Sequence, residues 1–307
     1  MDRCGNMKIL VTGGAGFIGS NIANELAKDN EVVVADNFFL GRKDNLEKNI
    51  IVKKCDILDR KKIFSLCKDI DFIFHQAAAS SSPMFLKNLN EAVSVNVNGF
   101  INILDAARKN DVKRVIYAST SSIYGNIKGP LREDMKTIPP NFYAASKLMD
   151  EFIADIYYKE YGLESIGLRY MSVYGPNEKG KGLFANMVSQ FLWSMQKGKR
   201  PVIYGDGKQT RDFVFVKDVV QANILAMKKK KIGHEIFNVG TGKATTLNEL
   251  VKILNKILGK NIKPLYVKNP VKNYIYTQLA DITKIRKMLG YQPRYSLEDG
   301  IKYILNS

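Results

Sequence analysis

The chain has 307 residues, of which 45% are hydrophobic and 25% charged, a composition typical of a globular protein with a large core. The apolar runs are too short to cross a bilayer, and the first residues lack the apolar stretch of a signal peptide. We therefore expect a cytoplasmic protein with no membrane partner. Its start stays open between Met1 and Met7.

The net charge of +17 makes nucleic-acid binding an alternative to consider, because clustered lysines pair with phosphates. The positive charges are spread along the chain, however, and the densest run, 228–231, ends a predicted helix. We expect no nucleic-acid partner and a general attraction for anionic small molecules. Cys4, Cys55 and Cys67 share no disulfide or metal spacing, so we expect reduced thiols and no metal.

The first half of the chain alternates short apolar runs with longer amphipathic stretches, which predicts a parallel sheet covered by helices. The expected strands are 8–11, 31–36, 71–76, 114–119 and 165–170, and the expected helices are 18–28, 91–110 and 143–161. After residue 176 the rhythm changes. One helix at about 185–196 and one strand at 236–239 are followed by two helices and a short strand.

A glycine-rich turn, Gly14-x-Gly16-x-x-Gly19, follows the first strand and opens a helix. Such glycines let backbone amides approach a pyrophosphate at the positive end of the helix. Asp36 ends the second strand, twenty residues after Gly16, where a carboxylate holds the adenosine ribose. The combination predicts dinucleotide binding and favours NAD, while Arg42 and Lys43 leave NADP open.

This arrangement predicts the fold class, an α/β protein with a doubly wound parallel-sheet Rossmann fold and a smaller, mixed α/β C-terminal lobe. We expect the NAD-binding domain to span 1–175 plus about 212–240. The substrate-binding lobe is expected to comprise about 176–211 and 241–307.

A second set of residues predicts redox chemistry on a hydroxyl group. Tyr143 and Lys147 are four residues apart and share a helix face, where the lysine and a nicotinamide ring would lower the pKa of the phenol. Such pairs are common on surfaces, but the polar run 118–122 ends a strand, where ligands meet open sheets. Thr120 or Ser121 would share the proton that Tyr143 removes.

Several further motifs accompany these residues. They are Thr12-Gly13-x-x-Gly16-x-x-Gly19, Asp36-Asn37, Asp56-Ile57, His75-Gln76-Ala77-Ala78, Asn96-Val97-x-Gly99, Tyr143-x-x-x-Lys147, and the blocks 168–176 and 205–213. With them the chain resembles, along nearly its whole length, the nucleotide-sugar epimerase/dehydratase branch of the extended short-chain dehydrogenase/reductase superfamily. UDP-glucose 4-epimerases belong to that branch.

The resemblance implies roles for individual residues. The implied cofactor-binding residues are Gly13, Gly16, Phe17, Ile18, Gly19, Asp36, Asn37, Asp56, Ile57, Ala77, Ala78, Asn96, Ser119, Tyr143 and Lys147. The implied catalytic residues are Thr120, Ser121, Tyr143 and Lys147. The implied substrate-binding residues are Ser172, Asn186, Tyr204, Arg211 and Lys272, the last where an arginine is usual. The resemblance also implies NAD as cofactor and a homodimer formed through helices 91–110 and 143–161.

One departure from the family pattern points to the reaction. Dehydratases follow the catalytic threonine with an acidic pair and decarboxylases carry a glutamate there, whereas this chain has Ser121-Ser122. We therefore predict an NAD-dependent epimerase, in first place a UDP-hexose 4-epimerase that works through a 4-keto sugar. The stretches 179–182 and 277–281 resemble ADP-heptose 6-epimerases, which stay an alternative together with other epimerases or reductases of nucleotide sugars. A non-enzymatic NAD(P)-binding regulator or RNA-binding relative is the third possibility.

Overall fold

The computed structural model describes residues 7–306. Cys4 and the segment between the two candidate start residues lie outside the described part of the chain.

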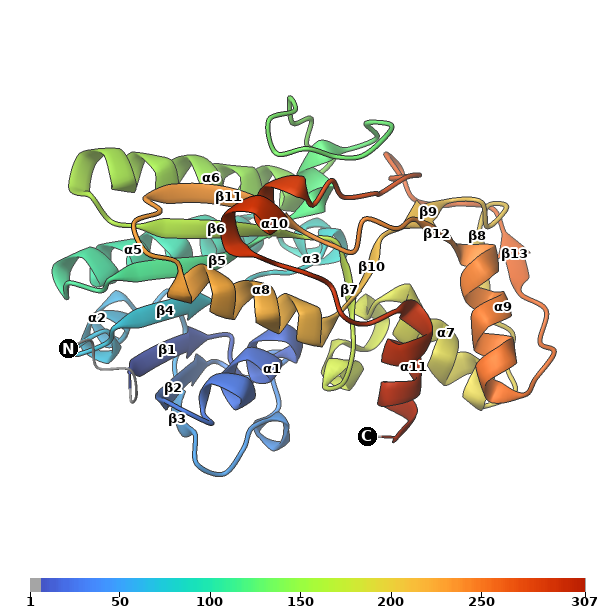
Figure 1. Ribbon diagram of the computed structural model, residues 1–307, viewed down its shortest axis with the longest axis horizontal. Coiled ribbons are helices and arrows are strands. Elements are labelled where there is room, and N and C mark those ends of the chain that lie inside the picture. Colours follow the sequence, from blue (N-terminus) through green and yellow to red (C-terminus); the bar gives the residue numbers. More distant parts are fainter. Residues whose placement is uncertain (1–6, 307) are drawn as a thin grey trace.

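A seven-stranded sheet forms the centre of the molecule, and all its strands are parallel (Figure 1). Its strands are β1 (Lys8–Thr12), β2 (Glu31–Asp36), β3 (Ile51–Lys54), β4 (Phe72–His75), β5 (Arg114–Thr120), β6 (Ser165–Tyr170) and β11 (His234–Val239). Their order is β11-β6-β5-β4-β1-β2-β3, which reverses direction between β1 and β4. The predicted doubly wound Rossmann fold is confirmed.

The predicted strands lie within one or two residues of the observed ones, apart from β3, which was not predicted. β3 lies at the edge of the sheet, and none of its four side chains is buried. Because an exposed edge strand needs no continuous apolar run, its sequence carries only a weak strand signal.

Helices cover both faces of this sheet (Figure 1). α1 (Phe17–Leu26) and α8 (Val216–Lys228) pack together on one face, while α2 (Arg60–Leu66), α5 (Gly99–Lys109) and α6 (Phe142–Tyr161) cover the other. Each layer buries its own apolar cluster against the strands. The buried strands therefore show the apolar runs that a two-sided parallel sheet requires.

The helix expected over residues 91–110 runs without a break from Leu89 to Lys109 but contains a π-helical turn. It consists of α4 (Leu89–Val93), a π-helical turn (Ser94–Asn98) and α5, and a further short helix, α3 (Ser82–Lys87), precedes it. The wider turn places the buried Asn96 side chain against the backbone of Ala79, whose N–H it accepts at 2.8 Å. A π-turn thus redirects one polar side chain inward, which periodicity could not indicate.

The C-terminal lobe has a core of its own, formed mainly by α7 (Met187–Gln196), α9 (Leu247–Leu258) and α11 (Leu297–Asn306). Two small sheets complete it: β8 (Val202–Tyr204) pairs with β13 (Leu265–Val267), and β9 (Thr210–Arg211) pairs with β12 (Thr245–Thr246). Two helices were expected after residue 247, but the structure has three. The additional helix, α10 (Thr283–Leu289), packs against β11 and α8 of the central unit.

Strand β7 (Ser172–Tyr174) pairs in parallel with β10 (Phe213–Phe215) and joins the lobe to the sheet, directly after β6. The lobe therefore faces the carboxyl ends of the central strands, where open α/β sheets bind their ligands (Figure 1).

Candidate functional site

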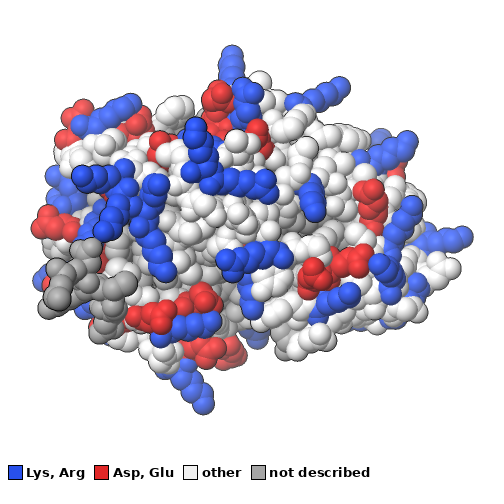
Figure 2. Space-filling model, in the orientation of Figure 1, with Lys and Arg blue, Asp and Glu red and all other residues white. Residues whose placement is uncertain are grey.

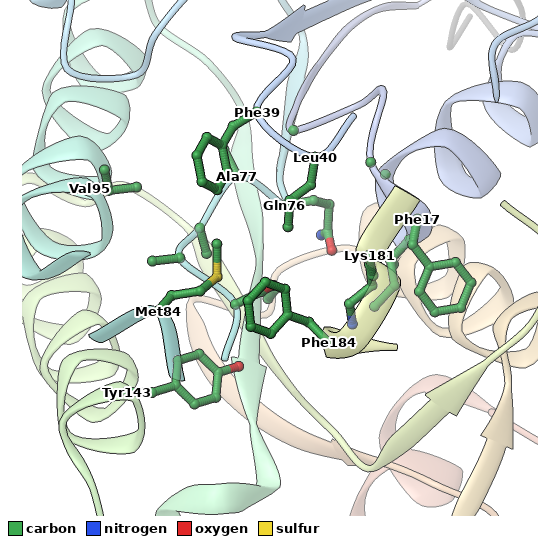
Figure 3. A pocket seen from close by; sticks show the side chains of 18 of the residues that line it. Phe17, Phe39, Leu40, Gln76, Ala77, Met84, Val95, Tyr143, Lys181 and Phe184 are labelled. Atoms are coloured by element: carbon green, nitrogen blue, oxygen red, sulfur yellow. The ribbon is translucent and has the colours of Figure 1, made fainter. Parts of the chain in front are cut away.

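A cavity of about 770 Å³ lies at the carboxyl ends of β1, β4 and β5. It is next to the position between β1 and β4 at which the strand order changes direction. Its walls come from distant parts of the chain, including the glycine-rich turn, α3, α6 and the helical segment η4 (Glu178–Phe184). Figure 3 shows Met84, Tyr143, Lys181 and Phe184 converging on it from three of these elements. The volume suits a ligand of dinucleotide size.

The glycine-rich turn forms the floor beside α1. Gly13 has a φ of +64°, and a Cβ atom there would lie 2.6 Å from the backbone nitrogen of Ala77. A Cβ atom on Gly19 would collide with the carbonyl oxygen of Gly13. Only glycines allow this close crossing of β1, α1 and the segment after β4. Gly16, Phe17 and Ile18 at the start of α1 thereby line the cavity, and a helix N-terminus is where a pyrophosphate binds.

Asp36 lies at the carboxyl end of β2, on the cavity wall. Its Oδ2 accepts the N–H of Ala15 at 2.9 Å and its Oδ1 accepts that of Phe38 at 2.7 Å. Burial raises the pKa of Asp36, and these backbone hydrogen bonds oppose the rise. Asn37 donates to Asp56 Oδ2 at 3.0 Å. These groups fit the adenosine end of NAD.

Thr120 ends β5, while Tyr143 and Lys147 lie on the first two turns of α6, and all three line the cavity. Asn141 caps α6 by accepting the N–H of Ala144 at 2.9 Å. Burial raises the pKa of Tyr143 above its ordinary value, while the charge of Lys147 and a hydrogen bond with Thr120 oppose this rise. The lowering that we expected from Lys147 therefore does not, by itself, outweigh burial.

A buried ion pair fixes α6 to the sheet beneath it. Arg169 on β6 donates from Nε and Nη2 to the two carboxylate oxygens of Glu151, at 2.9 and 2.7 Å. Ser119 donates to Glu151 at 2.5 Å. Such a bidentate pair restrains the helix in rotation and translation. Ser119 thus acts on the position of α6 as well as lining the cavity.

The far wall of the cavity contains residues to which the sequence assigned no individual role in the site. Gln278 donates to Ser121 Oγ at 3.0 Å and accepts from Ser172 Oγ at 3.4 Å. It thereby links its own segment to two distant ones. Phe184 faces the cavity near Tyr143 (Figure 3). Lys181 lies 3.9 Å from Glu178, and burial lowers its pKa while Glu178 opposes this. No local spacing relates these residues to Thr120 or Tyr143.

The structure brings most of the expected site residues to this one cavity. Those that line it are Gly13, Gly16, Phe17, Ile18, Gly19, Asp36, Asn37, Asp56, Ile57, Ala77, Ala78, Ser119, Thr120, Ser121, Tyr143, Lys147, Ser172 and Asn186. Asn96 does not line the cavity but bonds to Ala79 and Ser146 behind its wall.

Three expected substrate-binding residues lie outside the cavity wall: Tyr204, Arg211 and Lys272. Arg211 Nη1 donates to its neighbour's carbonyl, that of Thr210, at 2.7 Å, and its guanidinium lies 5.4 Å from the ring centre of Tyr274. Tyr204 ends β8 and is exposed, as is Lys272 in the loop after β13. In this structure they do not line the cavity together with Thr120, Tyr143 and Lys147.

The fold and this cavity define the chain as a dinucleotide-dependent enzyme of the Rossmann class. A model of the NAD dependent epimerase/dehydratase family matches residues 9–240. The UDP-glucose 4-epimerase of Thermotoga maritima, solved with UDP-glucose, is similar at 36% identity and a TM-score of 0.92, over 98% of each chain. The UDP-N-acetylglucosamine 4-epimerase of Methanobrevibacter ruminantium, solved with UDP-N-acetylmuramic acid, has 32% identity and a TM-score of 0.93, over 98% of each chain.

A third similar structure is the ADP-L-glycero-D-manno-heptose-6-epimerase of Helicobacter pylori, with 37% identity and a TM-score of 0.88, over 98% of this chain and 96% of that one. Other similar structures contain NAD. The chain belongs to the NAD-dependent epimerase/dehydratase family. The predicted cofactor, NAD, and the predicted class of enzyme, a nucleotide-sugar epimerase and thus an isomerase, are confirmed.

Within residues 7–306, no helix is both long and apolar enough to cross a membrane. The same residues contain no cluster of three His, Cys, Asp or Glu side chains arranged to hold a metal ion.

Proposed function

We propose that this protein is a UDP-hexose 4-epimerase. The observation that carries the proposal is the composition of the reacting end of the cavity, where Thr120, Tyr143 and Lys147 lie together and Thr120 is followed by two serines. These residues suit proton transfer to and from a hydroxyl group. Elimination of water would need an additional acid, and the Ser121 and Ser122 hydroxyl groups do not supply one.

In the proposed mechanism, NAD, when bound in this cavity, would supply the acceptor and donor for the hydride of the sugar carbon. Tyr143 removes the proton of the 4-hydroxyl group and later returns it, and Thr120 shares this proton. Lys147 holds the nicotinamide ribose and stabilises the phenolate by its charge. Rotation of the 4-keto sugar within the site, so that hydride returns to its opposite face, would invert the configuration at C4.

The proposal assigns the dinucleotide to residues 1–175 with about 212–240, and the nucleotide sugar to about 176–211 and 241–307. Ser172, at the end of the first unit, and Asn186, in the second, line the same cavity and are assigned to the sugar. Arg211 holds the substrate diphosphate, Tyr204 stacks on the base and Lys272 supports the diphosphate. Because these three residues lie outside the cavity wall, the proposal requires the segments 204–211 and 268–273 to move when substrate binds.

The substrate is tested by incubating the purified protein with UDP-, ADP-, GDP- and dTDP-sugars, without added NADH, and separating the products. We expect conversion of a UDP-hexose to its 4-epimer only. Release of a dehydrated or decarboxylated sugar, or a need for added NADH, would contradict the proposal.

One observation favours a second candidate, the 6-epimerisation of an ADP- or other NDP-heptose. Lys181 projects into the cavity from the segment 179–182, the same stretch that resembles heptose epimerases. The similarity to the H. pylori enzyme supports this candidate too. In the same product analysis, conversion of ADP-heptose in preference to every UDP-sugar would replace the leading proposal by this one.

We further propose that the protein is a homodimer that pairs through α6 and the α4–α5 region. Phe142, Met149, Phe152 and Ile156 are each at least half exposed, at spacings of seven, three and four residues along α6. This spacing aligns them in one apolar stripe, which is typical of a helix–helix contact. Leu89 and Val93 of α4 add exposed apolar surface.

Light scattering tests the dimer. We expect about twice the chain mass of 34.6 kDa for the wild type and the monomer mass for Phe152→Glu. Leu265→Glu, at an exposed apolar residue of the lobe, serves as the control and should stay dimeric. A monomeric wild type would refute the proposal.

We also propose a cytoplasmic enzyme without a nucleic-acid partner. Two observations support this. Cys55 and Cys67 are free and buried, as a reducing compartment allows. On the face in Figure 2, Lys and Arg side chains are interspersed with Asp and Glu and form no continuous basic strip. Salt-resistant retention of RNA on a filter would contradict it.

A further inference from the structure

The catalytic lysine candidate is held by a carboxylate that the proposed mechanism does not use. Lys147 Nζ lies 2.6 Å from Asp150 Oδ2, one turn further along α6. The side chain of Lys147 is 3% exposed and that of Asp150 is fully buried. The pair is therefore shielded from solvent. In such buried surroundings a charge–charge contact is far stronger than at a surface.

Among residues 7–306, Lys147 is the cation that acts on Asp150. On α6 it is adjacent to Lys147 and Glu151, and the Glu151 carboxylate is already paired with Arg169 of β6. The strands beneath contribute His75 of β4 and Tyr117 of β5, neighbours in register. Burial lowers the pKa of His75 to about 3, so the ring is neutral.

Two buried oxygen atoms at this place lack hydrogen-bond partners among residues 7–306, namely Asp150 Oδ1 and the Tyr117 hydroxyl. The negative charge of Asp150 contributes, after burial and Glu151, to raising the pKa of Tyr117. One carboxylate oxygen of Asp150 is paired with Lys147 and the other has no partner. Burying such a carboxylate costs free energy of folding. This cost suggests a functional reason for an acid at residue 150.

We propose that Asp150 is a positioning residue of the reaction, which fixes the Lys147 ammonium group and tempers the positive charge that this group presents to Tyr143. The inference rests on the proposed role of Tyr143 as the base. It adds a residue outside the cavity wall that sets the pH range of the enzyme.

The direction of the effect follows from the charges. Lys147 lowers the pKa of Tyr143, and the negative charge of Asp150 raises it. Burial raises the pKa of Asp150 itself to about 6, although Lys147 opposes this, so the pair is complete above that pH. Replacing the carboxylate by a neutral amide exposes Tyr143 to the full lysine charge. The phenol should then lose its proton at lower pH.

The test compares the pH profiles of kcat and KM for the wild type, Asp150→Asn and Asp155→Asn. Asp155 is the matched control, because it lies on the same helix and pairs at the surface with Lys159. We expect the acidic limb of the kcat profile of Asp150→Asn to move about one unit to lower pH. Asp155→Asn should follow the wild type. An unmoved acidic limb in Asp150→Asn would overturn the inference.

A second measurement does not depend on the substrate. The ultraviolet absorbance of tyrosinate, recorded against pH for the NAD-loaded protein minus its Tyr143→Phe variant, isolates one of the 15 tyrosines. The same difference in the Asp150→Asn background should show Tyr143 titrating about one unit lower. An unchanged titration would overturn the role of Asp150 even if the substrate proposal holds. If Asp150→Asn does not fold, Asp150→Ser provides the same comparison.

Discussion

The two halves of the cavity are built in different ways. The cofactor half consists largely of backbone: Gly13 crosses the segment at Ala77, and Asp36 is held by two N–H groups from residues within 21 positions of it. The substrate half consists of side chains from distant segments, such as Gln278 between Ser121 and Ser172. The first half depends on close backbone crossings that leave no room for a side chain, whereas the second depends on how the lobe is placed against the sheet.

This difference explains why similar enzymes share a cofactor while acting on different sugars. Backbone turns tolerate almost no change, since a Cβ atom at Gly13 meets main-chain atoms. A side chain at the lobe can be replaced without altering the fold.

Tyr143→Phe removes the hydroxyl group at the junction of the two halves. We expect kcat to fall roughly 1,000-fold, as for loss of a general base, while NAD affinity changes little. Steady-state kinetics and NAD titration measure the two quantities. Activity close to that of the wild type would show that another group is the base.

Gly13→Ala tests the rigidity of the cofactor half. The new Cβ atom would lie 2.6 Å from the nitrogen of Ala77 at a φ of +64°. We expect the variant to pay a strain of about 2–3 kcal/mol when its turn adopts the conformation that binds NAD. This strain would lower NAD affinity roughly 100-fold. Calorimetric titration with NAD measures it.

Gly259→Ala is the matched control for this variant, because Gly259 has a φ of +62° with open space around it, at the end of α9. It should cost about 1 kcal/mol of unfolding free energy and leave NAD affinity unchanged. Equal losses of affinity in both variants would mean that the turn has no special role.

Asp36→Asn tests whether the cofactor half selects NAD by charge. The carboxylate lies on the cavity wall and would repel a 2′-phosphate. Arg42 is close by, because its backbone N–H donates to the carbonyl oxygen of Ala15 at 2.9 Å. We expect the preference for NAD over NADP to fall by about tenfold. Binding titrations with both cofactors measure the ratio. A ratio equal to that of the wild type would assign the selectivity elsewhere.

The same contrast determines how much the sequence could predict. The glycine-rich turn, Asp36 and the Tyr143–Lys147 pair are local patterns, and the structure places all of them at the cavity. Asn96 was expected to line the cofactor path, but a π-turn directs it to Ala79. The stretch 277–281 was noted for its resemblance to heptose epimerases, but it gave Gln278 no role in the site, because the two partners of this residue lie 157 and 106 residues away. Only the fold brings such residues together, and no periodicity in the sequence encodes their proximity.

Gln278→Leu probes the substrate half and should have the smallest effect. The change leaves the hydroxyl groups of Ser121 and Ser172 without this partner, and each lost hydrogen bond costs about 1 kcal/mol. We expect KM for the sugar nucleotide to rise about fivefold, while NAD affinity stays that of the wild type. Gln196→Leu, at the exposed end of α7, is the control and should change neither quantity. If NAD affinity fell as much as substrate affinity, the two halves would be coupled through Gln278, and the division between a rigid cofactor half and an adaptable substrate half would have to be abandoned.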